Sequence, residues 1–222
     1  TDYTVSYSKN TAIGQASVKI TGKGLYKGTK TVNFNIRPAT VTKLKVSSTG
    51  EKSVKLSWKK ITGADSYAIY RYDNTSKKWH RIKTVKAVSF TDSGLARAKG
   101  YSYKVKAVKK SGGKEYISAS YSKAVEAVTK PAKASCTAKS SGSGSIEVSW
   151  KAVGGASGYE IYSSSNGSDY VKSAKVGGSQ KSAIVSGFEP YSLRMVKVRA
   201  YKTVNGKTSY GAFSQAVMVI VK

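Results

Sequence analysis

The sequence contains too little cysteine, histidine and acid to support most kinds of catalytic or metal site. Cys136 is the single cysteine, so no disulfide can form within the chain. His80 is the single histidine, and Asp and Glu together supply only 11 of 222 residues. Catalysis by a Ser or Cys nucleophile usually requires a histidine base, and metal sites require clusters of His, Cys or carboxylate. We therefore expect no catalytic residue, no metal site, no cofactor and no enzyme activity.

Long hydrophobic runs are also missing, and proline is scarce. No apolar stretch approaches the ~18–20 residues that cross a bilayer, so we expect no membrane insertion. Three prolines, 16 tyrosines and 21 glycines suit short strands joined by many turns. The first residues, TDYTVSYSKN, already look like a strand rather than a signal peptide, which predicts that the sequence is a piece of a longer protein.

Positive charge is what the chain has in excess. The formal net charge is +28, and residues 1–37, 38–129 and 130–222 each carry more basic than acidic side chains. Charge spread in this way attracts polyanions and keeps identical molecules apart, so we predict a monomer. Most of the basic residues are lysine, whereas arginine dominates specific phosphate and base contacts. We therefore expect weak attraction to anionic cell-wall polymers or glycans, and no nucleic-acid partner.

A stretch of 20 residues occurs twice in the chain. SVKLSWKKITGADSYAIYRY at 53–72 and SIEVSWKAVGGASGYEIYSS at 145–164 keep their apolar positions while their polar positions differ. The same spacing of 92 positions recurs later, because YSKAV at 121–125 matches FSQAV at 213–217. A constant offset over this distance predicts two complete domains with almost no insertion between them.

We predict these domains at 38–129 and 130–222, called here the first and second repeats. Proline ends strand pairing, so Pro131 marks their join. Within the repeats, apolar and polar residues alternate as they do in SVKLSW, and turn clusters recur every 8–12 residues or so. This pattern predicts an all-β fold made of tandem antiparallel β-sandwiches.

Each repeat resembles a fibronectin type III domain. The resemblance rests on a strand-B Trp, a strand-C Tyr-x-Ile and a strand-F block that begins with Leu or Phe. These positions are Trp58, Tyr67, Ile69, Leu95, Tyr101 and Val105 in the first repeat, and Trp150, Tyr159, Ile161, Phe188 and Val198 in the second. The resemblance implies that they form the two cores, and that Tyr101 makes the corner hydrogen bond beside the E–F turn. Arg194 replaces that tyrosine in the second repeat, which predicts a weaker lock there.

Residues 1–37 belong to neither repeat. DYTVSYSKN, ASVKITGKG and TVNFNI predict three short strands, and GKGLYKG at 22–28 predicts a turn, because it lacks the Lys-Ser/Thr ending of a phosphate loop. The segment resembles the C-terminal part of an immunoglobulin-like repeat of Gram-positive surface proteins. The matching positions are Asp2, Tyr3, Asn10, Gly22, Gly24, Tyr26, Gly28 and Phe34. Segments below ~40 residues seldom fold alone, so we expect either a remnant sheet without its other strands or one that leans on the first repeat.

One face of each repeat combines aromatic and basic residues. If the strand-C Tyr and Ile point inward, their neighbours point outward beside the basic residues of strand F. The outward residues are Tyr70, Tyr72, Lys104 and Lys106 in the first repeat, and Tyr162, Lys197, Arg199 and Tyr201 in the second. Tyrosine stacks on sugars and lysine attracts phosphate or carboxylate, so this is a candidate site for an anionic glycan. A plain solvated sheet face would have the same composition.

The missing chemistry and the family resemblance together favour a non-catalytic structural or adhesive spacer in an exported bacterial cell-surface protein. We accordingly expect an extracellular location, with anionic wall polymers and other domains of the same protein as partners. Two alternatives remain open. The chain is either an anionic-glycan-binding module that uses the outward strand C and F faces, or the accessory part of an exported hydrolase whose catalytic domain lies outside this sequence.

Overall fold

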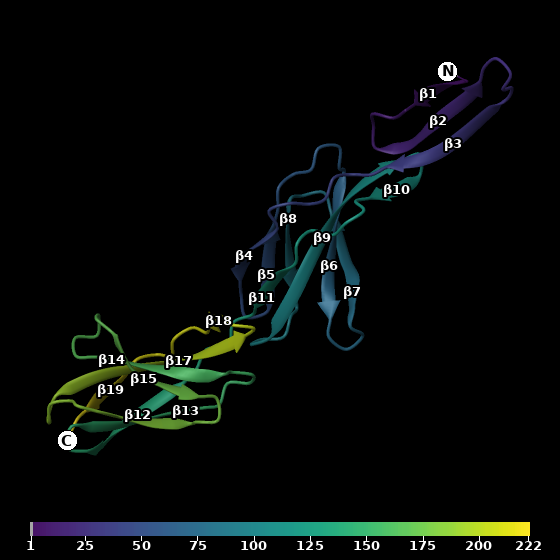
Figure 1. Ribbon diagram of the computed structural model, residues 1–222. Coiled ribbons are helices and arrows are strands. Elements are labelled where there is room, and N and C mark those ends of the chain that lie inside the picture. Colours follow the sequence, from purple (N-terminus) through teal and green to yellow (C-terminus); the bar gives the residue numbers. More distant parts are fainter. Residues whose placement is uncertain (1) are drawn as a thin grey trace. The chain divides into compact units, whose positions relative to one another are not determined.

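The computed structural model describes residues 2–222, and its regular elements in that range are all β-strands. The strands pair in antiparallel sheets, which confirms the all-β class (Figure 1). The described part of the chain has no helix that is long and apolar enough to cross a membrane.

The first 36 described residues form a three-stranded sheet in the order β1-β2-β3 (Figure 1). The strands are β1 (Tyr3–Ser8), β2 (Gly14–Gly22) and β3 (Thr29–Ile36). The GKGLYKG stretch is the turn between β2 and β3, as predicted, and the Gly22 amide donates to the Gly28 carbonyl across it. One face of the sheet is apolar and exposed; it includes Tyr3, Val5, Tyr7, Ile20, Val32 and Phe34. The resemblance of this segment to a bacterial immunoglobulin-like repeat stays a prediction.

The first repeat contains two sheets. Its strands are β4 (Lys45–Thr49), β5 (Ser53–Ser57), β6 (Ser66–Asp73), β7 (Lys78–Val85), β8 (Ser89–Ser93), β9 (Gly100–Ser111), β10 (Lys114–Ile117) and β11 (Val125–Val128). One sheet has the order β4-β5-β8, and the other has the order β10-β9-β6-β7 with β11 also paired to β9.

The second repeat reproduces this arrangement strand for strand. Its strands are β12 (Cys136–Gly142), β13 (Ser145–Trp150), β14 (Gly158–Ser164), β15 (Val171–Gly177), β16 (Ser182–Ser186), β17 (Leu193–Val204), β18 (Lys207–Tyr210) and β19 (Val217–Ile220). The sheets have the orders β12-β13-β16 and β15-β14-β17-β18, and β19 pairs with β17. The prediction of tandem antiparallel sandwiches is therefore confirmed.

The core of each sandwich contains a tryptophan and a tyrosine whose rings are in contact. The ring centroids of Trp58 and Tyr67 are 5.4 Å apart, and those of Trp150 and Tyr159 are 5.1 Å apart. Both pairs are buried. Buried aliphatic side chains complete the cores: Val54, Leu56, Ile69, Leu95 and Val105 in the first repeat, and Ile146, Val148, Ile161, Val185, Val196 and Val198 in the second. Tyr101 and Phe188, which were expected in the cores, are only half-buried.

Two kinds of hydrogen bond, each present in both repeats, explain why the residues that the repeats share include a tyrosine and a serine. The Tyr67 hydroxyl accepts from the Ile61 amide at 2.9 Å, and the Tyr159 hydroxyl accepts from the Val153 amide at 2.7 Å. The serines of YSKAV and FSQAV are both buried, and each hydroxyl accepts a strand amide: Val105 to Ser122 at 2.9 Å and Val198 to Ser214 at 3.0 Å. Each of these bonds gives a backbone donor in the interior a partner.

The turns and irregularities of the strands also recur. A β-bulge interrupts the register after Ile69 and again after Ile161. The hairpins β9–β10 and β17–β18 turn through two residues with positive φ, Gly112-Gly113 and Asn205-Gly206. Two-residue turns of this type match the right-handed twist of antiparallel strands and require residues that tolerate positive φ.

The predicted corner hydrogen bond is present in the first repeat, where the Ala96 amide donates to the Tyr101 hydroxyl at 2.9 Å. In the second repeat Arg194 takes this place and its guanidinium lies 5.0 Å from the centre of the Phe188 ring. Arg194 Nε is buried and has no hydrogen-bond partner among the described residues. The sequence predicts that this corner is less stable than that of the first repeat. The unpaired Arg194 Nε agrees with this expectation, which stays a prediction.

Internal contacts divide the chain into two compact units. One consists of the chain up to Ser47 with Lys55–Phe90 and Ser102–Glu126, and the other consists of Ser48–Val54, Thr91–Tyr101 and Ala127–Lys222. The domain limits of 38–129 and 130–222 remain a prediction.

Candidate ligand-binding face

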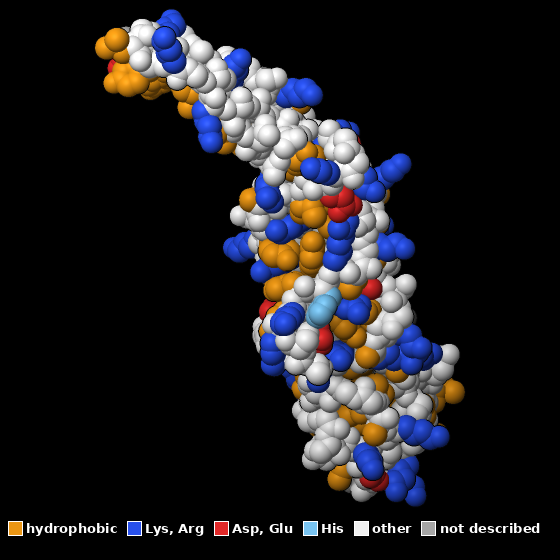
Figure 2. All heavy atoms as spheres, turned by 90° about the vertical axis from the view of Figure 1, so that its right-hand side faces the viewer, with side chains coloured by type: hydrophobic (Ala, Val, Ile, Leu, Met, Phe, Trp, Pro, Cys, Tyr) orange, Lys and Arg blue, Asp and Glu red, His pale blue; other side chains and the backbone are white. Residues whose placement is uncertain are grey.

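Strands β6, β7 and β9 of the first repeat bring the predicted aromatic and basic residues together. Tyr70 meets Tyr121 edge to face with ring centroids 5.0 Å apart, and Lys106 Nζ lies 4.2 Å from the centre of the Tyr121 ring. Lys104 Nζ lies 4.5 Å from the Trp79 ring centre, and Trp79 in turn contacts Tyr72. Figure 2 shows basic side chains spread over one side of the molecule, with few acidic ones among them.

The second repeat builds a longer ladder of the same kind. Lys197 Nζ lies 3.5 Å from the Tyr170 ring centre and 4.5 Å from that of Phe213. The Arg199 guanidinium comes next, at 4.8 Å from Phe213 and 4.1 Å from Tyr210. Tyr162 and Tyr201 belong to the same face, because Arg199 also lies over Tyr162 and Lys175 lies over Tyr201. Such cation–π contacts hold the long basic side chains in place.

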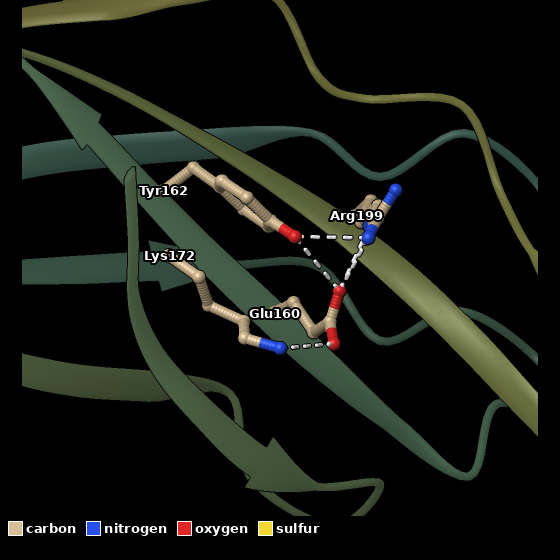
Figure 3. A network of polar contacts seen from close by, with 4 residues as sticks. All are labelled: Glu160, Tyr162, Lys172 and Arg199. Atoms are coloured by element: carbon tan, nitrogen blue, oxygen red, sulfur yellow. Dashed lines mark hydrogen bonds and ion pairs between the residues drawn. The ribbon is translucent and has the colours of Figure 1, made fainter. Parts of the chain in front are cut away.

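A buried carboxylate lies beneath this second ladder. Glu160, on β14, is 1% exposed, and it is held by basic residues from both neighbouring strands (Figure 3). Arg199 of β17 donates from Nε at 2.9 Å and from Nη2 at 2.7 Å to Oε2, while Lys172 of β15 donates at 3.2 Å to Oε1. The Tyr162 hydroxyl also donates to Oε2, at 3.3 Å. The carboxylate therefore has both charge neutralisation and hydrogen bonds, which a buried acid requires.

The electrostatics of Glu160 follow from these contacts. Burial favours the neutral acid, but the hydrogen bonds from Arg199 and Lys172 more than offset it, so the pKa of Glu160 lies below its ordinary value. The same contact with Glu160 raises the pKa of Lys172. Glu160 is consequently an ionised internal counter-ion rather than a proton donor.

The first repeat has a different acid on its face. Glu115 of β10 accepts from Arg81 of β7, with Oε2 at 3.0 Å from Nη1 and Oε1 at 3.4 Å from Nη2. The hydrogen bond from Arg81 lowers the pKa of Glu115. Ala68 occupies the register position on β6 that Glu160 occupies on β14: Ala68 is opposite Lys106, and Glu160 is opposite Arg199.

All eight predicted face residues are half-buried, and cations of the chain itself lie over two of their rings, those of Tyr162 and Tyr201. The arrangement can attract an anion through preplaced ammonium and guanidinium groups. Stacking a sugar on these rings would require the cations to move away first. The role of the eight residues in ligand binding therefore stays a prediction.

Several members of the two faces were missed in the sequence. They are Arg37, Trp79, Arg81, Glu115 and Tyr121 in and beside the first repeat, and Glu160, Tyr170, Lys172, Lys175, Tyr210 and Phe213 in the second. Tyr121 and Phe213 were detectable, because they start the matched YSKAV and FSQAV stretches. Glu160 also alternates with Tyr159 and Ile161, which places it on the outward side of β14. Its burial was unexpected and results from the long side chains that cover it.

His80 and Cys136, the side chains considered for catalysis, each contact other side chains of the fold. His80 Nε2 lies 2.9 Å from Ser76 Oγ and 3.9 Å from the Asp73 carboxylate, in the exposed β6–β7 hairpin. Cys136 is partly buried at the start of β12, with Sγ 3.1 Å from Ser214 Oγ. Within residues 2–222, no three His, Cys, Asp or Glu side chains gather in a way that could hold a metal ion. A cleft of about 590 Å³ near Tyr3 and Tyr26 contains none of the predicted face residues.

The sequence of the chain is similar to part of a bacterial enzyme. It is 42% identical over 97 residues to the poly(3-hydroxybutyrate) depolymerase of Ralstonia pickettii. The match covers 44% of this chain and 18% of the depolymerase, so the chain spans less than a fifth of that protein. No family model matches the chain.

The solved structures that the chain resembles include fibronectin type III segments. The FN1–FN3 domains of chicken CNTN1 align with a TM-score of 0.42 and 17% identity, over 94% of this chain and 77% of theirs. A two-domain fibronectin type III segment of chicken tenascin aligns with a TM-score of 0.46 and 18% identity, over 82% of this chain and 98% of its own.

Proposed function

We propose that the chain is a non-catalytic spacer in an exported bacterial protein, and that it serves there as the accessory part of a polymer hydrolase. The observation that carries the proposal is the match to the poly(3-hydroxybutyrate) depolymerase. That match is strong in sequence, yet it is confined to less than a fifth of the enzyme. A shared segment of this size is about one sandwich domain. A spacer domain can occur in proteins of different catalytic activity, because it takes no part in the reaction.

Two features of the chain support this function. Its two sandwiches repeat the same strand order and core, so the second adds length to the chain. Its acids are few, and several of them are paired with basic residues. The net charge of +28 would add a diffuse attraction to anionic wall polymers.

The size and location of the native protein test this proposal. An antibody raised against residues 38–222 is used to probe the cytoplasm, cell wall and medium of the source organism. We expect a protein clearly larger than 23.7 kDa in the wall or the medium. A cytoplasmic protein of the size of this chain would overturn the proposal.

The accessory role is tested with the longer protein itself. Deletion of residues 38–222 should leave its hydrolysis of a soluble short-chain ester unchanged and should slow its hydrolysis of the insoluble polymer. A matched control deletes residues 130–222 alone, which shortens the spacer while keeping one sandwich, and should give an intermediate rate. Loss of activity on the soluble ester after either deletion, or hydrolysis by the isolated chain, would contradict a spacer.

An adhesive module for anionic glycans is the second candidate function, and the half-buried ladders of Lys, Arg and aromatic rings favour it. A spacer binds acidic polymers only in proportion to its total charge. An adhesin instead depends on a few residues, so the two differ in how binding responds to single-site substitutions.

A further inference from the structure

The aromatic and basic faces of the two repeats differ in whether a carboxylate lies beside the central basic residue. Lys106 of β9 and Arg199 of β17 occupy the same register position, opposite Ala68 and Glu160 respectively. Arg199 is bound to the Glu160 carboxylate at 2.7 Å. Lys106 has no acid at that place, because the alanine methyl cannot neutralise it.

A second cation, Arg37, lies near Lys106. Lys106 Nζ donates to the Ala119 carbonyl at 3.0 Å, and Arg37 Nη1 donates to the Ile117 carbonyl at 3.4 Å. The two acceptors are two residues apart, one at the end of β10 and one in the loop that follows it, so the ammonium and guanidinium groups share one short stretch of backbone. Burial, and after it the positive charge of Arg37, lowers the pKa of Lys106.

We propose that Arg37 and Lys106 form a binding site for one oxyanion of an acidic polymer, and that the second repeat lacks such a site because Arg199, the register counterpart of Lys106, is already bound to the Glu160 carboxylate. Like charges repel even in bulk water, and an anion between them removes that cost. Glu115 does not supply the anion, because both of its oxygens face Arg81. The Glu160 cluster in the second repeat shows how one carboxylate and two cations pack on this face.

The site is organised before any ligand arrives. Lys106 lies over the Tyr121 ring, and Lys104 lies 4.5 Å from the Trp79 ring and 5.3 Å from the Tyr121 ring. Side chains held in this way lose little freedom on binding, which favours affinity. Because the lysines cover these ring faces, the recognised group is the oxyanion itself rather than a sugar ring. A carboxylate of an acidic polysaccharide and a phosphate of a wall polymer share this chemistry.

This inference goes beyond the proposed function, because a spacer requires no specific site. The test measures binding of the full chain to two probes, polygalacturonate for carboxylate and inorganic polyphosphate for phosphate, by isothermal titration calorimetry at fixed ionic strength. The site variant carries Arg37→Gln and Lys106→Gln. The matched control carries Lys151→Gln and Lys181→Gln, which removes the same charge from exposed positions of the second repeat that belong to neither face.

We expect the site variant to bind at least tenfold more weakly than the parent chain, and the control variant to lose less than twofold. Loss with polygalacturonate alone assigns the site to carboxylates, loss with polyphosphate alone assigns it to phosphates, and loss with both assigns it to oxyanions in general. Equal losses in the two variants, or no binding of either probe by the parent chain, would overturn the proposal and leave the spacer function intact.

A second pair of variants tests the role of the internal acid. Ala68→Glu places a carboxylate opposite Lys106, and Ala68→Gln adds the same bulk without the charge. We expect Ala68→Glu to weaken binding about tenfold relative to Ala68→Gln, with circular dichroism showing that both retain the fold. Equal affinities for the two folded variants would contradict the proposal.

Discussion

The two repeats share a fold and a core, but each leaves a different buried polar group without a hydrogen-bond partner. The first repeat has the corner hydrogen bond of Tyr101, yet the buried indole nitrogen of Trp58 has no partner among residues 2–222. The second repeat satisfies its indole, since Trp150 Nε1 donates to the Gln180 carbonyl at 3.1 Å, and has the orphaned Nε of Arg194 at the corner. Each sandwich therefore tolerates one buried unsatisfied donor, at a different place.

This difference shows which features the fold requires and which it only permits. The Trp–Tyr contact, the tyrosine that caps a loop amide and the buried serine occur in both repeats. The corner tyrosine and the indole hydrogen bond each occur once. A buried unsatisfied donor costs about 1–3 kcal/mol, which a sandwich with a complete apolar core can absorb.

Truncation of the shared core should have the largest effect, and it should be the same in both repeats. Ile69 and Ile161 are fully buried at equivalent positions. Replacement of either by alanine leaves a cavity, and we expect each to lower the free energy of unfolding of its own repeat by about 2–5 kcal/mol. Hydrogen exchange of the β6 and β14 amides in the full chain reports each repeat separately. A cost below about 1 kcal/mol in one repeat would show that the cores are not equivalent.

Glu160 should give the next largest effect, confined to the second repeat. Glu160→Gln removes the charge that binds Arg199 and Lys172, and we expect the second repeat to lose about 2 kcal/mol of stability. The sign of the pH dependence follows from the lowered pKa of Glu160. The stabilisation is present above the pKa of the unfolded chain and is lost as the pH falls through the folded pKa.

Acid titration of the exchange rates in β14 checks this pH dependence. The parent chain should lose protection in the second repeat as the pH falls below the ordinary glutamate range, and Glu160→Gln should remove that dependence. Glu147→Gln is a suitable control, because Glu147 is paired with the exposed Lys139. An identical acid response in the parent and Glu160→Gln would contradict the assignment.

The sequence was sufficient for the parts of the molecule that depend on apolar periodicity. The alternation in SVKLSW and SIEVSW and the 92-residue offset predicted the strands, the sandwiches and the burial of Trp58 and Trp150. The buried state of Glu160 was not predictable, because it depends on how Arg199 and Lys172 from two other strands close over it. The proximity of Arg37 and Lys106 likewise depends on the Ile117 and Ala119 carbonyls, which no sequence pattern marks.

The indole hydrogen bond should produce a smaller difference between the repeats. Trp150→Phe removes a bond to the Gln180 carbonyl, whereas Trp58→Phe removes a donor that has no partner. Both lose ring contacts, so the difference between them isolates the hydrogen bond. We expect Trp150→Phe to cost about 1 kcal/mol more than Trp58→Phe in the exchange of the corresponding repeat. Equal costs would indicate that the Gln180 carbonyl finds another donor.

The smallest expected effect is a difference in acid response between the β6–β7 turn and the β14–β15 turn. In the first, the Asp73 carboxylate accepts from the Thr75 amide at 2.9 Å and from the Ser76 hydroxyl at 2.7 Å. These bonds lower the pKa of Asp73 to about 2, and the hydrogen bond from the Ser76 hydroxyl contributes most. In the second, the neutral side chain of Asn166 accepts the equivalent amides, from Ser168 and Asp169.

The first turn should therefore respond to acid through the Asp73 carboxylate that caps it, whereas the Asn166 amide that caps the second has no proton to gain. The stabilisation from Asp73 is present above the unfolded pKa, about 3.9, and is lost as the pH falls through about 2. Carbon NMR titration of the Asp73 carboxyl measures the midpoint directly, and Ser76→Ala should raise it towards the ordinary value. Thr75→Ala is the matched control, because it keeps the Thr75 amide and the Ser76 hydroxyl. An unshifted midpoint in the parent chain would mean that the hydrogen bonds of this exposed turn do not persist in solution.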